Sequence, residues 1–266
     1  MKLRILGTGA AYATNYYNTS FIIDSKSEYF LVDGTGGNDI LKIFKEENLD
    51  WNKLHNAYLS HQHTDHFLGM IWVIRYISSL ILKEKYKENF NLYLHAELKE
   101  KVLLVCNELL NKKEADLIGK RIKLIVVSAS EVLNILNMKF TFFDINSIKA
   151  KQFGFRLDYL NKSLVFCGDE PLNIKNYKYA KNVDLLMLEA YCLDSEAAIY
   201  NPREMSHNTV KKSAICANSL EVKQLLIYHT EDNTTYGKRE SLYLNEAKKY
   251  FSGEVFVPND LKVLDI

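Results

Sequence analysis

The sequence has few of the residues that interrupt folded structure, and its charges almost cancel. Among 266 residues there are only 3 prolines and 11 glycines, which excludes a collagen-like or low-complexity chain. Its 34 lysines and arginines exceed its 33 aspartates and glutamates by one, a formal net charge of +1. No overall field therefore draws the chain to nucleic acid or to an anionic membrane, although the balance is compatible with a local basic patch.

Paired cysteines and long apolar runs are also lacking. The four cysteines form no C-x-x-C pair, and in a chain of this length they predict reduced, buried thiols: Cys106, Cys167, Cys192 and Cys216. Gly7 and Gly9 interrupt the apolar start before it could form the core of a signal peptide. The stretch Phe67–Leu82 contains Arg75 and two serines and is too short for a comfortable membrane span. We therefore predict a cytoplasmic protein with no membrane partner.

What the sequence does contain is a repeated order of strands and helices. Short β-branched and aromatic runs precede helical patterns at 67–88 and 97–111. A second series of strands precedes a helix that is expected to start near His207 and a final helix at 240–251. This order predicts an α/β fold in which two mixed β-sheets are flanked by helices, an αββα sandwich formed by one domain over residues 1–266.

The most informative motif is Ser60-His61-Gln62-His63-Thr64-Asp65-His66, directly after a predicted strand. His61 and His63 are two residues apart, so they project to the same side of an extended backbone. Asp65 and His66 follow where the chain must turn, and they can face a second point nearby. Three imidazoles and one carboxylate are ligands suited to zinc. The alternative is a polar loop that is rich in histidine by chance, which is improbable because the chain has only seven histidines.

Two later predicted strands also end in residue types that are able to bind metals. Gly168-Asp169 follows the apolar run 164–167, and His229 follows the run 225–228. Gly168 permits a sharp turn, so Asp169 is expected at the mouth of the strand, where its two oxygens could bridge two cations. Each residue alone could be a cap or an ordinary turn residue. Together with the histidine cluster, they favour metal ligation.

These motifs resemble the metallo-β-lactamase superfamily: H-x-H-x-D-H at 61–66, the later Gly168-Asp169, and a terminal strand that ends in His229. Other segments resemble its ribonuclease Z-like phosphodiesterase branch, namely Leu6-Gly7-Thr8-Gly9-Ala10-Ala11, Asn18-Thr19-Ser20, Val32-Asp33-Gly34, Glu189-Ala190 and His207-Asn208-Thr209.

The resemblance implies a hydrolase with a dinuclear zinc site, in which manganese is an alternative metal. One ion would take His61 and His63, and the other would take Asp65, His66 and His229, with Asp169 bridging both. Two such ions can hold a hydroxide at neutral pH and polarise the phosphoryl oxygen that it attacks. The residues assigned to catalysis are Asp65, His207 and Glu189. By resemblance, His207 protonates the leaving oxygen and Glu189 orients its ring, while Asp33 is interpreted as a supporting or turn residue.

The sequence departs from this pattern in one ligand. The family supplies a third histidine to the first metal, but no histidine lies between His95 and His207. In the matching stretch 143–149, Asn146 or Asp144 could supply an oxygen instead, and Asn146 is retained as a candidate metal ligand. Glu170 also stands where the branch more often has threonine.

The spacing of the motifs predicts a small substrate. The branch members that process transfer RNA carry a long arm near this point, yet Gly154 and Asp169 are only 15 residues apart. We therefore predict a phosphodiesterase for a cyclic nucleotide or short oligonucleotide, with a homodimer as a candidate assembly. The alternatives are a ribonuclease Z-type tRNA 3′ endonuclease, a lactone or ester hydrolase on the same site, and a non-catalytic metal- or ligand-binding sensor.

Overall fold

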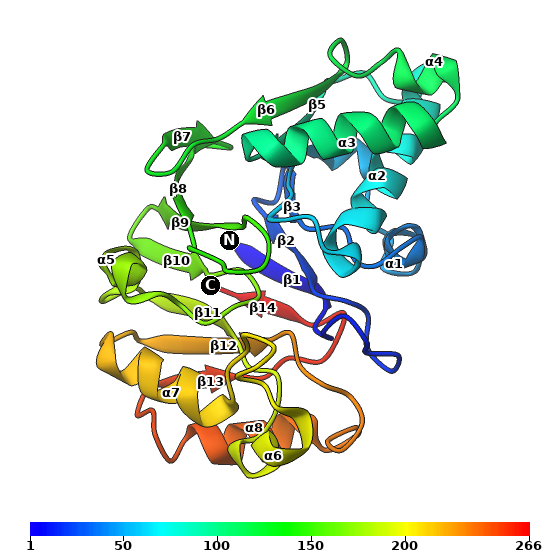
Figure 1. Ribbon diagram of the computed structural model, residues 1–266. Helices are drawn as coiled ribbons and strands as arrows, with labels where there is room; N and C mark the ends of the chain where they lie inside the picture. Colours follow the sequence, from blue (N-terminus) through cyan, green and yellow to red (C-terminus); the bar gives the residue numbers. More distant parts are fainter. The chain divides into compact units, whose positions relative to one another are not determined.

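The computed structural model describes residues 1–266, and the chain divides into two compact units. Unit 1 comprises residues 1–7, 17–128 and 261–265, and unit 2 comprises residues 8–16, 129–260 and 266. Each unit contains one seven-stranded mixed sheet with its own helices (Figure 1). The prediction of two mixed sheets flanked by helices is confirmed, while the assignment of residues 1–266 to one domain stays a prediction.

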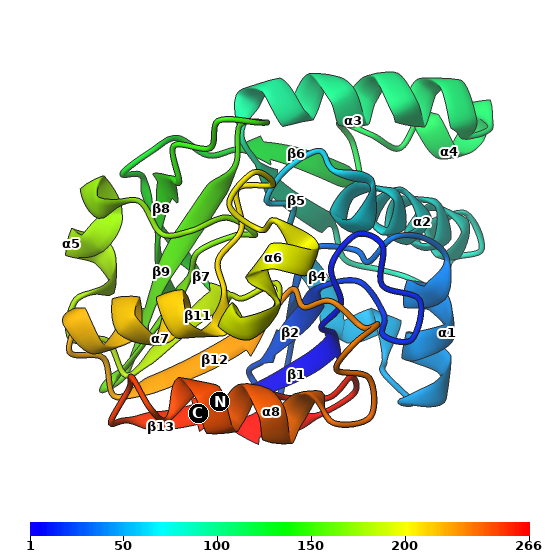
Figure 2. The same cartoon turned by 60° about the horizontal axis from the view of Figure 1, so that its bottom comes forward.

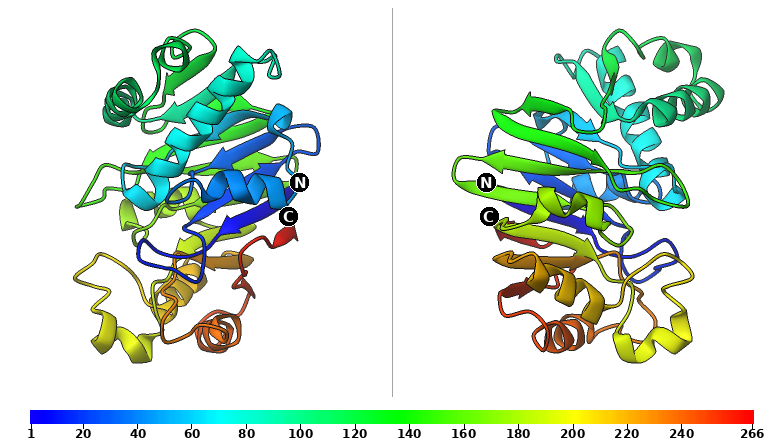
Figure 3. Two further views of the ribbon diagram at one scale, coloured as in Figure 1. Left: turned by 90° about the vertical axis from the view of Figure 1, so that its right-hand side faces the viewer. Right: turned by 60° about the vertical axis from the view of Figure 1, so that its left-hand side comes forward.

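The sheet of unit 1 begins with antiparallel strands and continues with parallel ones. In sheet order its strands are β14 (Val263–Asp265), β1 (Lys2–Gly7), β2 (Ser20–Asp24), β3 (Tyr29–Val32), β4 (Leu54–Tyr58), β5 (Phe90–Leu94) and β6 (Ile122–Val126). Strands β2 and β3 are buried along their whole length, as their aromatic and β-branched residues predict. Strands β1 and β14 lie side by side, so both ends of the chain meet at one edge of this sheet (Figure 3).

Helices cover the apolar face of this sheet and form the core of unit 1 with it. The helical segments are α1 (Asp39–Glu46), a 3-10 turn (Trp51–Lys53), α2 (Thr64–Leu82), α3 (Ala96–Leu109) and α4 (Lys112–Ala115). In α1 the buried residues Ile40, Ile43 and Phe44 recur at helical spacing. Helix α2 is long and apolar enough to cross a membrane by length and composition, but 61% of its apolar window is buried. Since core helices pass the same test, α2 is only weak evidence for a membrane span.

The sheet of unit 2 also combines an antiparallel part with a parallel part. In sheet order its strands are β13 (Glu254–Phe256), β12 (Gln224–Tyr228), β11 (Leu185–Glu189), β10 (Lys162–Phe166), β9 (Phe153–Tyr159), β8 (Met138–Asp144) and β7 (Val132–Ile135). Strands β10 to β13 are parallel, so their carboxyl ends meet at one edge. That edge is where ligand-binding residues gather in sheets of this kind.

The helical segments of unit 2 are a 3-10 turn (Ile174–Asn176), α5 (Tyr177–Ala180), a 3-10 turn (Asp194–Glu196), α6 (Ala197–Tyr200), α7 (Val210–Ser219) and α8 (Arg239–Ala247). Figure 2 shows α7 and α8 alongside β11, β12 and β13, and their buried residues share one core with these strands. The expected start of α7 near His207 is three residues too early. Thr209 is the N-cap, and its hydroxyl accepts from the Lys212 N–H, so His207 lies in the preceding turn.

All four cysteines are free thiols, as the sequence predicts. Cys106, Cys167 and Cys192 are buried, and Cys216 is half-buried. Burial raises the pKa of Cys106 to about 12, because a thiolate would lose its hydration there. A buried thiol with such a pKa is inert at neutral pH, so Cys106 is a structural residue.

Candidate metal centre

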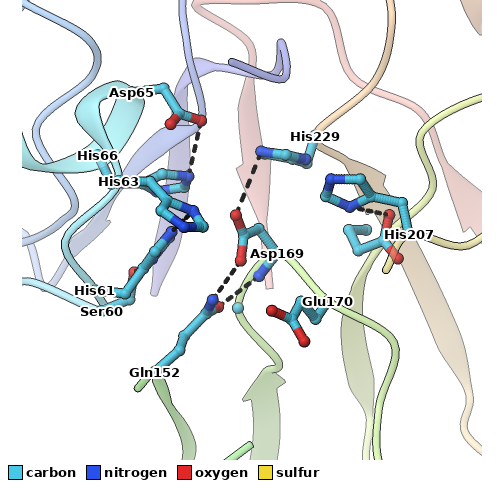
Figure 4. A network of polar contacts seen from close by, with 12 residues as sticks. Ser60, His61, His63, Asp65, His66, Gln152, Asp169, Glu170, His207 and His229 are labelled. Atoms are coloured by element: carbon cyan, nitrogen blue, oxygen red, sulfur yellow. Dashed lines mark hydrogen bonds and ion pairs between the residues drawn. The ribbon is translucent and has the colours of Figure 1, made fainter. Parts of the chain in front are cut away.

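The histidine cluster of unit 1 lies at the carboxyl ends of two neighbouring parallel strands. Ser60 and His61 follow β4, and α2 begins at Thr64 with His63 as its N-cap residue. Asp33 follows β3, the strand beside β4. The tight succession of strand, loop and helix brings the histidines of this short segment together (Figure 4).

His61 and His63 face each other as their two-residue spacing predicts. Nε2 of His61 lies 2.9 Å from Nδ1 of His63, and the ring centroids are 4.4 Å apart. Nδ1 of His61 is held by the Ser60 hydroxyl at 2.9 Å. The Ser60 contact fixes the ring so that Nε2 is the nitrogen turned towards His63. Two imidazole nitrogens that converge in this way fit a site for a zinc-like cation.

His66 and Asp65 form the second part of the cluster. Asp33 accepts from Nδ1 of His66 at 2.8 Å, while Nε2 of His66 lies 3.2 Å from Asp65 Oδ2. Burial disfavours the charged ring, but Asp65 and Asp33 outweigh it and raise the pKa of His66 well above its ordinary value. The surroundings of His66 therefore favour a positive charge, which a metal cation would also supply.

Asp33 is a supporting residue, which agrees with its interpretation from the sequence. Its carboxylate accepts from the Ser60 N–H, the Ser60 hydroxyl and His66, each at 2.8 Å. A carboxylate behind a metal-binding histidine fixes the tautomer of the ring and makes the opposite nitrogen a better ligand. The sequence alone did not reveal that Ser60 supports both Asp33 and His61.

Asp169 and His229 come together in unit 2 from the ends of parallel strands β10 and β12. Nε2 of His229 lies 3.7 Å from Asp169 Oδ2, and both residues are buried. The Tyr228 hydroxyl donates to the Gly168 carbonyl, so the residues before each member of the pair are bonded to each other. After His229, the Thr230 N–H donates to the Thr8 carbonyl at 3.0 Å, so Thr8, which lies between Gly7 and Gly9, is bonded to this strand end.

Gln152 is a site residue that sequence reasoning missed. It is fully buried, its amide Nε2 donates to Asp169 Oδ1, and its Oε1 accepts from the Asp169 N–H at 2.7 Å (Figure 4). Glutamine carries no metal-ligand signature, and 17 positions separate it from Asp169 in the sequence. The only available signal was its position just before the strand Phe153–Tyr159, which pairs with the strand that leads to Asp169.

His207 and Glu189 lie close together, as the sequence predicts. Nδ1 of His207 is 3.6 Å from Oε2 of Glu189, and the Asn208 N–H donates to Glu189 Oε1 at 2.6 Å. The His207 ring stacks on Tyr191 with centroids 5.4 Å apart, and it lies 5.2 Å from the His229 ring.

The electrostatics of this pair favour a protonated ring. Burial disfavours the charged form of His207, but Glu189 outweighs this and raises the pKa of His207. Burial also raises the pKa of Glu189, against the opposing effect of His207. A ring that holds its proton near neutral pH is suited to give that proton to a leaving group.

Asn146 occupies an exposed turn. Its side-chain amide donates to the Asp144 carbonyl at 3.0 Å, and its backbone N–H donates to the Asp144 carboxylate at 2.8 Å. The amide group thus stabilises its own turn, where φ of Asn146 is +61°. A role for Asn146 as a metal ligand stays a prediction.

The chain is similar to several known proteins in sequence and in fold. Residues 1–195 match the family model described as anti-Pycsar protein Apyc1. Ribonuclease Z of Haloferax volcanii is 28% identical over 106 residues, which are 40% of this chain and 32% of that protein. The chain thus matches about a third of that relative. Ribonuclease Z of Picrophilus torridus is 25% identical over an alignment that covers 81% of this chain and 80% of that protein.

Solved structures with the same fold include the metallo-β-lactamase fold protein YhfI from Bacillus subtilis, with a TM-score of 0.78, 20% identity and 99% of both chains covered. The short form of human tRNase Z has a TM-score of 0.75 and 18% identity, over 100% of this chain and 99% of that chain. A diphosphatase from the PhnP family has a TM-score of 0.75 and 16% identity, over 100% and 97% of the two chains.

These likenesses confirm the predicted metallo-β-lactamase fold and the resemblance to ribonuclease Z, and the names of the relatives agree with a metal-dependent hydrolase. The family model covers 195 of the 266 residues, including the histidine cluster, Asp169 and Glu189. His207 and His229 lie beyond the matched segment. The chain therefore belongs to the family of the anti-Pycsar protein Apyc1, within the metallo-β-lactamase fold.

Proposed function

We propose that the protein is a metal-dependent phosphodiesterase that acts on a small phosphodiester, such as a cyclic nucleotide or a short oligonucleotide. The observation that carries the proposal is a set of candidate ligands at the strand ends of each unit, His61, His63, Asp65 and His66 in unit 1 and Asp169 and His229 in unit 2. In this proposal His61, His63 and Asp169 would hold one ion, and Asp65, His66 and His229 would hold the other. The carboxylate of Asp169 has two oxygens, so Asp169 would be available to both ions.

The chemistry of the donor set fits zinc, with manganese as an alternative. Imidazole nitrogens and carboxylate oxygens are ligands that both ions accept. When bound, two such ions lower the pKa of water and polarise a phosphoryl oxygen. Asp33 and Ser60 hold the rings of His66 and His61, so the chain itself sets which nitrogen each ring presents.

His207 is the proposed proton donor to the leaving oxygen. The ring is held between Glu189 and Tyr191, and its raised pKa keeps a proton available near neutral pH. An alkoxide or a nucleoside oxyanion is a poor leaving group unless it receives a proton. The His207–Glu189 pair thus favours a phosphodiester over a lactone, an ester or a non-catalytic ligand.

The hairpin β9–β10 supports a small substrate. Tyr159 pairs with Lys162, so only residues 160 and 161 join the two strands, and no arm protrudes there. With a formal net charge of +1, the chain also lacks the strong basic character that favours folded RNA. The relatives named ribonuclease Z make precursor tRNA the competing substrate. The homodimer and the cytoplasmic location remain predictions.

The proposal is tested by metal analysis together with hydrolysis assays. We expect the wild type to retain zinc or manganese and to hydrolyse bis(p-nitrophenyl) phosphate and cyclic mononucleotides. His63→Ala and Asp169→Ala should each lose metal and activity, whereas His55→Ala, a histidine outside the ligand set that contacts Glu28, should keep both. Equal metal content in all four proteins contradicts the metal centre. Efficient, site-specific cleavage of precursor tRNA would instead support the ribonuclease alternative.

A further inference from the structure

Gln152 makes two hydrogen bonds to one residue of the proposed metal centre. Its side chain is fully buried, its amide nitrogen donates to Asp169 Oδ1, and its amide oxygen accepts from the Asp169 backbone N–H. The amide therefore binds the backbone and the carboxylate of Asp169 together. This arrangement fixes the side-chain torsions of Asp169 relative to its own peptide.

The turn before Asp169 is shaped around this amide. Gly168 has a φ of +73°, and a Cβ atom at Gly168 would collide with Oε1 of Gln152. The Tyr228 hydroxyl donates to the Gly168 carbonyl. The turn is thus held by a residue before β9 and by the residue that precedes His229.

The chemistry of an amide suits this position. A lysine or arginine in its place would neutralise Asp169 and compete with a metal cation, whereas an uncharged donor leaves the negative charge intact. The amide N–H of Gln152 donates to Oδ1 of Asp169, whereas Oδ2 of Asp169 lies 3.7 Å from Nε2 of His229. The two oxygens of Asp169 therefore have different surroundings before any ion binds.

We propose that Gln152 is a positioning residue that presets the Asp169 carboxylate for metal binding. The inference rests on the proposed function, because it assumes that Asp169 is a ligand. In the proposed function only two histidines would share an ion with Asp169, so an imprecise carboxylate would leave that ion with a weak donor set. Partners that orient metal ligands typically contribute 10- to 100-fold to metal affinity.

The experiment measures the zinc affinity of the full-length protein by competition with a chelator, and repeats the measurement with manganese. Gln152→Met keeps the length of the side chain but removes both hydrogen bonds, and we expect zinc affinity to fall by roughly 10- to 100-fold. Gln152→Asn keeps a polar amide but withdraws it from Asp169, and it should also weaken zinc binding. The matched control is Gln224→Met, because the Gln224 amide donates to the Glu254 carboxylate at 2.7 Å outside the ligand set.

Thermal unfolding without metal separates positioning from a purely structural role. If both Gln152 variants unfold at a lower temperature but bind zinc as tightly as the wild type, the inference is overturned. Asp169→Asn provides the reference for the metal centre itself. When this variant loses zinc and Gln152→Met does not, only the present inference fails. When Asp169→Asn binds zinc like the wild type, the proposed function fails instead.

Discussion

Replacement of His207 by alanine should separate proton donation from metal binding. The ring lies in the turn before α7, where Glu189 contacts one nitrogen and Tyr191 covers one face. In the proposed function His207 is not a ligand, although its ring lies 5.2 Å from that of His229. We therefore expect His207→Ala to keep its metal and its affinity for substrate.

The expected loss is in kcat. A positioned general acid contributes about 10²- to 10⁴-fold in rate, which corresponds to roughly 3–5 kcal/mol of transition-state stabilisation. The full loss applies to cyclic nucleotides, because their leaving oxygen needs a proton. It should shrink for bis(p-nitrophenyl) phosphate, since p-nitrophenolate departs without one. Glu189→Gln should show a smaller loss with the same dependence on the leaving group, because the amide oxygen can still accept from the Asn208 N–H.

The assay compares kcat and KM for both substrates at saturating metal, together with the metal content of each variant. His55→Ala is the control, because His55 also contacts a glutamate, Glu28 at 3.2 Å, but lies outside the proposed centre. If His207→Ala loses metal, His207 is a ligand. If it slows both substrates equally while its metal content is unchanged, the ring has a structural role and the reasoning about proton transfer is wrong.

Two further predictions concern stability. Arg239→Leu should lower the free energy of unfolding by about 3 kcal/mol, measured by urea denaturation. The buried guanidinium donates three hydrogen bonds, to Thr8, Thr230 and the Pro258 carbonyl, and each contributes roughly 1 kcal/mol. A change below about 1 kcal/mol would contradict this. Burial alone would raise the pKa of Asp184, but hydrogen bonds from Lys223 and Ser163 lower it, so Asp184→Asn should cost about 1 kcal/mol at pH 7. A lowered pKa stabilises the folded state fully above the ordinary pKa of the carboxyl group, so this difference should begin to shrink as the pH falls through about 4 and should be lost below the lowered pKa of Asp184. A difference that stays constant throughout an acid titration of both proteins would refute the cause.

Sequence reasoning succeeded where local residue patterns carry the information. Short β-branched and aromatic runs predicted the strands, and helical spacing predicted α2 and α3. The segment 60–66 could be interpreted directly because its residues are neighbours in the chain. Asp169 and His229 could be placed because parallel strands present their carboxyl ends at one edge of a sheet.

The rest depends on contacts that no local pattern encodes. Gln152 bonds to Asp169 only because β9 and β10 pair in one register, in which Phe155 lies opposite Phe166. Arg239 bonds to Thr8 across 231 positions of sequence. The predicted start of α7 near His207 was too early, because Thr209, a favourable N-cap residue, caps the helix and leaves His207 in the turn before it.

The backbone at the strand ends offers independent support for a functional site. Asp33 and His229 have φ values of +58° and +57°, a region that costs a residue other than glycine roughly 1–2 kcal/mol. Each position is held there by several bonds: three donors reach the Asp33 carboxylate, and the residue after His229 bonds to Thr8 and Ala10. Glycine or asparagine would adopt this conformation with less strain, but neither offers a carboxylate or an imidazole. Local strain at Asp33 in unit 1 and at His229 in unit 2, each of which follows a parallel strand, is typical of sites where side-chain chemistry outweighs local stability.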